Sequence, residues 1–388
     1  TTHMSYMLNY KAFNKDGVGY TGEERVKAEA AARQMGYQFE LESGIVVMQP
    51  RVSEQLLIDA IGDSGDRRAL CFSLGRGQLA AHLVDQGAKE VQLLFSDIYL
   101  AEQAAGNLAS WSGVRVKCEV DFPEGPFQLA ALPCSRRGDG ELTRELMQQC
   151  YHRLEPGGEF WVSVDAPKDT WVRNELGKLN RSVSRHIFEN GVVYRLVRGH
   201  SSVRLRNFAC EFKFRDQDRL IDLKTTPGVF SHRRLDTGAR CLIETMEVMA
   251  GDRILDLGCG AGGVGIAAAL RAPETHVTMV DVNPRALACA EWGLKKNEVR
   301  QFETCLNAYV EVEPSGSYDL VLSESPVLLR STDCQNHVRR WLQGFKACRD
   351  DVVGDEATGV VPRAIWRQGR RIPILVVAQL HDHRGQAV

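Results

Sequence analysis

Apolar and glycine positions follow a regular order between residues 252 and 283. This segment reads DRILDLGCGAGGVGIAAALRAPETHVTMVDVN, in which a short apolar run leads into a glycine-rich turn, a helical stretch and a second apolar run. Short continuous apolar runs bounded by turn residues are typical of strands buried inside a sheet. The pattern therefore predicts a βαβ unit, with a helix from about Gly263 and a second strand that ends at Asp281.

A similar order of apolar runs and glycines occurs earlier in the chain, over residues 67–109. That segment reads RRALCFSLGRGQLAAHLVDQGAKEVQLLFSDIYLAEQAAGNLA. We align its Leu74-Gly-Arg-Gly77 with Leu257-Gly-Cys-Gly260, and its Asp97 with Asp281. Internal similarity of this kind indicates that one structural unit occurs twice.

Later segments of the first copy have the same character. Phe127-Gln-Leu-Ala-Ala-Leu-Pro133 parallels the apolar strand near residue 320, and LEPGGEFWVSV (154–164) supplies a Pro-Gly-Gly turn and a last strand. We expect the α/β fold class, with two tandem Rossmann-like domains, each a mostly parallel twisted sheet flanked by helices. The expected domains are residues 5–210 and 211–388.

Length and composition agree with two domains. The chain has 388 residues, too many for one ordinary core, and 44% of them are hydrophobic and 25% charged. No apolar run reaches the roughly 18 residues of a membrane span, and the first residues lack a signal-peptide pattern, so we expect a cytoplasmic protein with no membrane partner. The 11 cysteines have no paired spacing, which favours reduced thiols and no metal site. With a net charge of −2, any nucleic-acid partner must bind a local basic patch.

Three glycines of the second copy, Gly258, Gly260 and Gly262, lie where the backbone must turn tightly and where a ligand could approach it. The following helix presents its N-terminal amides to the same place. Asp281 ends the next strand, where a carboxylate can accept hydrogen bonds from both hydroxyls of a ribose. A nucleotide-like ligand fits these residues, and so does a Rossmann-like domain in which they only form turns and core.

The residues around the glycines resemble those of one family. Asp256-Leu-Gly-Cys-Gly-Ala-Gly262 is similar to the first motif of class I S-adenosylmethionine-dependent methyltransferases. The resemblance implies S-adenosyl-L-methionine as the cofactor, with Asp256 and the glycine loop at its methionine portion and Asp281 at its ribose, near Asn283. Asn307 stands where this family usually has an aspartate against the adenine amino group, and its amide keeps an acceptor oxygen.

A second motif narrows the resemblance. TTPGVFSHRRLDTGARCLIE (225–244), together with the tandem layout, resembles bacterial rRNA guanine-N2 methyltransferases of the small- and large-subunit type, over nearly all of residues 5–323. In that family this segment covers the cofactor. The resemblance therefore implies that Phe230, Ser231 and Asp236 lie over the site.

The strand YDLVLSESP (318–326) departs from the family at its end. The family places Asn-Pro-Pro and an aromatic residue there, which accept hydrogen bonds from the target amine and stack on the base. Here Glu324, Ser325 and Pro326 occupy those catalytic positions. Two explanations stay open: the tail from about residue 324 has diverged, or it is frameshifted, because codons for Glu-Ser-Pro-Val-Leu-Leu can encode Asn-Pro-Pro-Tyr-Tyr-Ser when read a single base later.

Residues 181–206, between the two copies, interleave arginines with aromatic residues. Guanidinium groups bind phosphates and aromatic rings stack on bases, so this stretch predicts RNA contacts through Arg195, Arg198 and Arg204. A solvated hairpin packed on the first domain explains the same pattern equally well.

The first copy lacks several residues of the second. In our alignment Ser73 replaces the loop carboxylate, and Arg76 lies inside the glycine turn. We interpret this copy as a non-catalytic domain that supports the fold or holds the substrate.

We therefore expect a monomeric methyltransferase that transfers a methyl group from S-adenosyl-L-methionine to the exocyclic N2 amine of a guanine, with ribosomal RNA or a ribosomal subunit as partner. The sulfonium is already activated, so the protein has to supply proximity and orientation and no metal. Two other functions stay open. One is a catalytically impaired cofactor-binding protein that binds RNA or assists assembly, and the other is a methyltransferase acting on protein glutamine or a small molecule.

Overall fold

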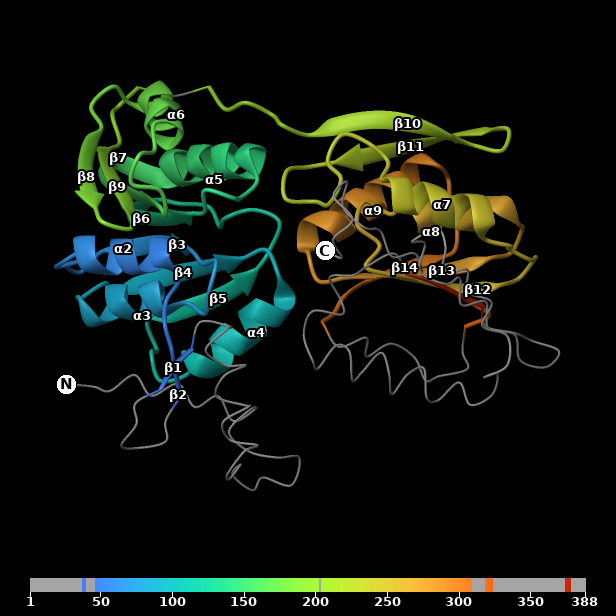
Figure 1. Ribbon diagram of the computed structural model, residues 1–388, viewed down its shortest axis with the longest axis horizontal. Helices are drawn as coiled ribbons and strands as arrows, with labels where there is room; N and C mark the ends of the chain where they lie inside the picture. The colour runs from blue at the N-terminus through green and yellow to red at the C-terminus, as the bar shows by residue number, and fades with distance from the viewer. Residues whose placement is uncertain (1–36, 40–45, 202–203, 309–317, 324–373, 378–388) are drawn as a thin grey trace, which may run out of the picture.

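The computed structural model describes residues 37–39, 46–201, 204–308, 318–323 and 374–377, which form two α/β units (Figure 1). The first unit has the strands β3 (Arg68–Phe72), β4 (Glu90–Phe95), β5 (Val114–Cys118), β6 (Phe127–Cys134), β7 (Leu154–Val164), β8 (Ser184–Phe188) and β9 (Gly191–Val197). Its helices are α2 (Val52–Ala60), α3 (Gln78–Asp85), α4 (Ile98–Asn107), α5 (Gly140–Arg153) and α6 (Trp171–Leu179). Before them, β1 (Tyr37–Phe39) and β2 (Val46–Met48) form an antiparallel pair.

The seven strands of the first unit form one sheet in the order β5-β4-β3-β6-β7-β9-β8. They are parallel except where β9 pairs with β7 and with β8. Helices cover both faces, which explains why the four residues of β3 after Arg68 are all apolar. Leu70 and Phe72 pack into the core beneath α5 and α6, whereas Ala69 and Cys71 pack into the core beneath α2, α3 and α4. Since successive strand residues point to opposite faces, a strand covered on both sides has no polar face.

The second unit begins with the hairpin β10 (Cys210–Asp216) and β11 (Arg219–Thr225), next to the domain boundary predicted at residue 210. Its sheet has the strand order β14-β13-β12-β15-β16 and is parallel throughout. The strands are β12 (Arg253–Leu257), β13 (His276–Asp281), β14 (Phe302–Leu306), β15 (Leu320–Ser323) and β16 (Ile374–Val377), and the helices are α7 (Thr237–Thr245), α8 (Gly263–Arg271) and α9 (Pro284–Lys296). The hairpin and the three helices lie on one face of the sheet (Figure 1).

The two sheets repeat one topology, which confirms the predicted fold class. Strands β5-β4-β3-β6-β7 of the first unit have the same order as β14-β13-β12-β15-β16 of the second. The turn after the central strand ends in both units at a left-handed glycine that precedes a helix. These glycines are Gly77, with φ of 83°, and Gly262, also with φ of 83°.

This equivalence corrects our alignment of the two copies by two residues. The amide of Ser73 donates to the carbonyl of Leu94, and the amide of Gly258 donates to the carbonyl of Val280. Ser73 therefore corresponds to Gly258 and not to the loop carboxylate. The sequence alignment matched Gly-x-Gly to Gly-x-Gly, but the glycine that must adopt φ > 0 at the helix start is the last one of each turn.

The correspondence of Asp97 with Asp281 in the sequence alignment is also wrong by two residues. Asp97 caps the start of α4, where its carboxylate accepts the amide of Leu100, and Asn283 caps the start of α9. Asp97 is thus the counterpart of Asn283. The counterpart of Asp281 is Phe95, the last residue of β4, which is fully buried. The first unit consequently has no carboxylate at the predicted ribose position.

Among the described residues, no helix has the length and apolarity needed to cross a bilayer. Within the same part of the chain, no three His, Cys, Asp or Glu residues gather as a metal site would require.

A buried ion pair secures the end of α8 that lies away from the glycine turn. Arg271 donates through Nε and Nη2 to the two carboxylate oxygens of Asp216, at 2.9 and 2.7 Å, and also to the carbonyls of Ile243 and Met246. The two charged side chains are only 12% and 9% exposed.

We predict that Arg271→Met lowers the free energy of unfolding by about 3–5 kcal/mol, because it leaves Asp216 buried without its cation. Urea denaturation measures this, with Lys295→Met as control. Lys295 forms an exposed pair with Glu291, and its loss is expected to cost less than about 1 kcal/mol.

Candidate functional site

The glycine turn between β12 and α8 forms one wall of the candidate site. Gly258, Gly260 and Gly262 all have positive φ, of 71°, 54° and 83°. A Cβ atom on Gly262 would lie 3.0 Å from Cβ of Ala290, so the turn can pack against α9 only with glycine there. At Gly260, by contrast, an added Cβ would meet no atom of the described residues within 4 Å. The turn is therefore packed on its inner side and open at Gly260.

Asp256 lies inside the turn and holds it to the helix. Its side chain is almost fully buried, and Oδ2 accepts the amide of Gly265 at 2.9 Å. Burial raises the pKa of the Asp256 carboxyl to about 7, the Gly265 amide opposes this rise, and the charge of Asp281 adds to it. The carboxyl thus changes its charge near neutral pH.

Asp281, at the end of β13, connects two turns. Its Oδ2 accepts the amide of Gly260 at 2.8 Å, and its Oδ1 accepts the amide of Asn283 at 2.9 Å. Burial raises the pKa of the Asp281 carboxyl, and the amides of Asn283 and Gly260 oppose that rise. The amide of Asn307, just after β14, donates to the carbonyl of Asp281 at 3.1 Å. The predicted residues Gly260, Asp281, Asn283 and Asn307 therefore meet at the carboxyl edge of the sheet.

Asn283 also connects the site to the segment between β11 and α7. Its side-chain amide donates to the carbonyl of Gly228 at 2.8 Å, and its Oδ1 accepts the amide of Arg285. At the other end of this segment, the side chain of Leu235 reaches the start of α8, where it would lie 3.0 Å from a Cβ on Gly263. The segment thus lies beside the glycine turn.

The three predicted residues of this segment differ in their surroundings. Phe230 is 71% exposed, and Ser231 beside it has a φ of 55°. Asp236 is the N-cap of α7, where its carboxylate accepts the amide of Gly238 at 2.7 Å. Phe230 is available for a contact with a ligand, whereas Asp236 has at least a structural function.

The positions predicted to be catalytic, Glu324, Ser325 and Pro326, lie outside the described residues. Ser323, the residue before them, ends β15 and pairs in register with Leu257, the last residue of β12. Strand β15 therefore ends directly beside the start of the glycine turn.

The predicted RNA contacts fall into two groups. Arg195 pairs with Glu159 at 2.5 Å and lies over the Trp161 ring. Arg198 donates to the carbonyls of Tyr151 and His152. These two guanidinium groups are thus engaged within the first unit, which is the packed hairpin that the sequence left open as an alternative. Arg204 is exposed.

A buried carboxylate of the first unit was not predicted from the sequence. Glu54, on α2, is fully buried, and its Oε1 accepts the hydroxyl of Ser73 and the amides of Leu74 and Gly75. These groups belong to the first unit's own glycine turn. Burial raises the pKa of Glu54, and the three hydrogen bonds oppose that rise. An internal carboxylate thus occupies backbone amides that in the second unit border the candidate site. Sequence gave no signal for this contact, because 19 residues separate Glu54 from Ser73.

The fold of the second unit, its glycine turn and the acid at the end of β13 resemble those of class I methyltransferases. Residues 220–344 match the family described as methyltransferase small domain. The resemblance inferred from the glycine turn is thereby confirmed for this part of the chain.

Particular relatives agree with this class. Ribosomal RNA small subunit methyltransferase C of Haemophilus influenzae is 34% identical over 122 residues, which are 31% of this chain and 36% of that protein. Its Pseudomonas syringae counterpart is 28% identical over 214 residues, 55% of this chain and 63% of the relative. The chain therefore matches between about one third and two thirds of the length of these relatives.

A solved structure shows that the likeness extends to both units. The Thermus thermophilus 16S rRNA N2 G1207 methyltransferase, in complex with AdoMet and guanosine, superposes with a TM-score of 0.63 at 17% identity. The match covers 79% of this chain and 85% of that structure. At this level of identity the comparison establishes the shared two-unit fold.

The raised pKa of Asp256 predicts how stability depends on pH. The folded protein holds this proton up to about pH 7, whereas the ordinary pKa is 3.8, so folding binds a proton between these values. The stabilisation from this group is complete below about pH 4 and is lost as the pH rises through about 7. We expect Asp256→Asn to remove this dependence, which amounts to about 4 kcal/mol at most. Urea denaturation of cofactor-free protein at several pH values between 5 and 8 measures the difference between the two proteins. A constant difference would contradict the shift.

Proposed function

We propose that this protein transfers a methyl group from S-adenosyl-L-methionine to the exocyclic N2 amine of a guanine in ribosomal RNA, as a cytoplasmic monomer. The observation that carries the proposal is the meeting of Asp256, the glycine turn and Asp281 at the carboxyl ends of β12 and β13. Ligands of open α/β sheets bind at this edge. The relatives named above are rRNA methyltransferases, and this supports RNA as the substrate class.

The residues of the turn suit this cofactor. Gly260 leaves its backbone open, so a ligand can approach the main chain closely. Asp281 already accepts two amides, and a carboxylate has further lone pairs with which to accept both ribose hydroxyls. Asn307 would then face the adenine, and Asp256 would hold the glycine loop around the methionine portion.

The cofactor supplies a methyl group that is already activated by its sulfonium. The chain's own residues then have to bind, orient and exclude water. The N2 lone pair of guanine is delocalised into the ring, so hydrogen-bond acceptors must hold the amine in a reactive orientation. Such acceptors would follow Ser323, because β15 ends there beside the glycine turn. Phe230 is an exposed aromatic ring on the neighbouring segment and could contact the base or the cofactor.

A second candidate function follows from the sequence at that place. Glu324, Ser325 and Pro326 replace Asn-Pro-Pro, so the amine-orienting groups differ from those of the family. This favours a cofactor-binding protein that binds RNA without methylating it. An intact mass of the natural protein, together with resequencing of the codons for Ser323 to Leu329, decides whether Asn-Pro-Pro-Tyr is made instead.

The first test measures binding and transfer separately. Calorimetry reports the affinity for S-adenosyl-L-methionine, and tritium-labelled cofactor reports methyl transfer to small ribosomal subunits or naked rRNA that lack the modification. Binding with transfer to guanine N2 supports the proposal, and binding without transfer supports the second candidate. Transfer to protein or to a small molecule would replace ribosomal RNA as the substrate. Absence of cofactor binding would overturn both functions.

Asp281→Ala tests the cofactor site. We expect the affinity for S-adenosyl-L-methionine to fall by about 2–4 kcal/mol, since the variant loses charge-assisted hydrogen bonds to the ribose. Glu291→Ala is the control, because Glu291 is an exposed acid on the helix after Asp281 and pairs with Lys295. Calorimetry that gives the same affinity for Asp281→Ala and the control would remove Asp281 from the site.

Arg204→Glu tests the RNA prediction at the arginine that is exposed. We expect weaker binding to rRNA. We also expect the slope of log affinity against log salt concentration to become smaller, by the contribution of about one phosphate contact. Arg219→Glu, at another exposed arginine, makes the same change of charge in the hairpin β10–β11. Filter binding at several salt concentrations compares the two variants. Equal effects would indicate that only net charge matters.

Replacing Arg195 or Arg198 is instead expected to lower the melting temperature, because both are engaged within the first unit.

A further inference from the structure

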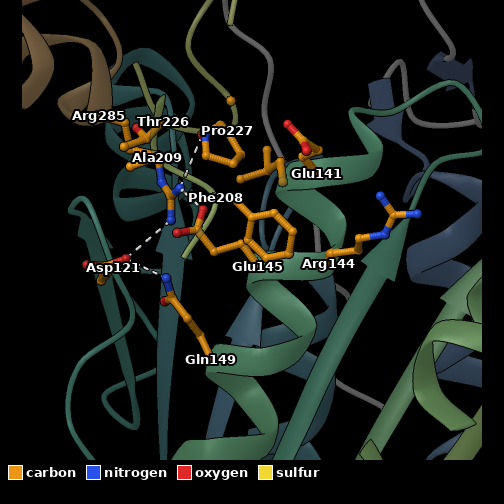
Figure 2. Close-up of polar contacts among 12 residues, drawn as sticks. Asp121, Glu141, Arg144, Glu145, Gln149, Phe208, Ala209, Thr226, Pro227 and Arg285 are labelled. Carbon is orange, nitrogen blue, oxygen red and sulfur yellow. Dashed lines mark hydrogen bonds and ion pairs between the residues drawn. The ribbon is translucent and has the colours of Figure 1, made fainter. Parts of the chain in front are cut away.

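Arg285 connects the two units from the interior of the protein. It is the second residue of α9 and is only 3% exposed. Its Nη1 donates to Oε2 of Glu145 at 2.6 Å and to the carbonyl of Pro227 at 3.1 Å. Its Nη2 donates to Oδ1 of Asp121 at 3.3 Å. Glu145 lies on α5 and Asp121 follows β5, so a guanidinium of the second unit binds two carboxylates of the first (Figure 2).

Glu145 is the stronger of the two partners. Its side chain is 21% exposed, whereas that of Asp121 is 52% exposed and is more screened by water. Removing one partner of a buried pair leaves the other charge without compensation, which makes such pairs sensitive to substitution. The position of Arg285 in the second unit therefore depends mainly on α5 of the first.

Arg285 is also connected directly to the candidate cofactor site. Its amide donates to Oδ1 of Asn283, and the amide of Asn283 donates to Oδ1 of Asp281. Val282, between them, accepts through its carbonyl a hydrogen bond from the amide of Ile98, at the start of α4 of the first unit. The backbone that follows Asp281 is thus held from the first unit at two points, Val282 and Arg285.

The neighbouring segment is held by the same helix. Gly228, whose carbonyl accepts from the Asn283 side chain, donates its amide to Oδ2 of Asp139 at 3.0 Å. Asp139 is the N-cap of α5. Two residues after Asp139, in the first turn of α5, Glu141 pairs with Arg233 at 3.0 Å. Helix α5 therefore holds both the turn after Asp281 and the segment beside the glycine turn.

We propose that Arg285 is a positioning residue for the cofactor, and that the first unit organises the ribose-binding turn through the Arg285–Glu145 pair. The inference rests on the proposed function in one respect, which is that S-adenosyl-L-methionine binds at Asp281. A carboxylate must lie within a fraction of an ångström of its place to accept both hydroxyls of a ribose. The degenerate first unit thus contributes to cofactor affinity without contacting the cofactor.

The test compares Arg285→Met with Arg271→Met in the full chain. Both variants remove a buried arginine of the second unit that pairs with a carboxylate, but Arg271 lies at the end of α8 remote from the glycine turn. We expect both to lower the melting temperature, and only Arg285→Met to raise the calorimetric Kd for S-adenosyl-L-methionine, by tenfold or more. Glu145→Gln, which keeps a hydrogen-bond acceptor, is expected to raise Kd less, and adding it to Arg285→Met should change Kd little further.

Equal Kd values for Arg285→Met and the wild-type protein would overturn the inference, and so would an equal rise in Kd for Arg271→Met. If Arg285→Met does not fold, Glu145→Gln and Arg285→Lys are used for the same comparison.

A second measurement needs no cofactor. Under conditions in which hydrogen exchange reports local opening, the amides of Gly260 and Asn283, both of which donate to Asp281, should exchange faster in Arg285→Met and at an unchanged rate in Arg271→Met. This result stands even if the wild-type protein binds no cofactor, whereas unchanged exchange would overturn the positioning role alone.

Discussion

The candidate site depends on the two hydrogen bonds that the carboxylate of Asp281 accepts. One oxygen accepts the amide of Gly260 and the other accepts the amide of Asn283, so one side chain joins the glycine turn to the turn before α9. An aspartate at the end of a buried strand is costly unless its oxygens are hydrogen-bonded, and the two amides reduce that cost. They also orient the carboxylate at the carboxyl edge of the sheet, where Asn307 donates to the Asp281 carbonyl and where β15 ends beside the neighbouring strand β12.

The first unit shows what remains of the same topology without this interaction. Phe95 stands at the position of Asp281, and Glu54 occupies the amides of the first unit's own glycine turn. The sheet and its two cores nevertheless persist, because they depend on apolar strands and covering helices rather than on the turn. What the first unit supplies to the second lies elsewhere, in the carboxylates of α5 that hold Arg285, Gly228 and Arg233. The first unit thus lacks the aspartate of the candidate site, but it holds residues of the second unit that lie next to that site.

Several sequence predictions rested on local patterns and agree with the structure. The strand that ends at Asp281, the helix that starts at Gly263 and the glycine turn between β12 and α8 are encoded within about 30 neighbouring residues, so periodicity and turn residues predict them. The alignment of the two copies was wrong by two residues, because similar glycine patterns occur at both registers and only backbone conformation distinguishes them. For Arg195 and Arg198 the sequence left RNA contacts and a packed hairpin equally open, since it does not reveal that Glu159 and the Tyr151 carbonyl lie opposite them.

By itself, the sequence determined the α/β class, the duplication, and the residue types at the second unit's turn, because each depends on hydrophobic period or on local backbone conformation. The replacement of Asn-Pro-Pro by Glu324, Ser325 and Pro326 is likewise a property of the sequence alone. Only the tertiary structure decided which side chains pair across long separations. Glu54 meets Ser73 across 19 residues, and Arg285 meets Glu145 across 140. Such pairs form where packing brings two units together and excludes water, and neither condition can be deduced from neighbouring residues.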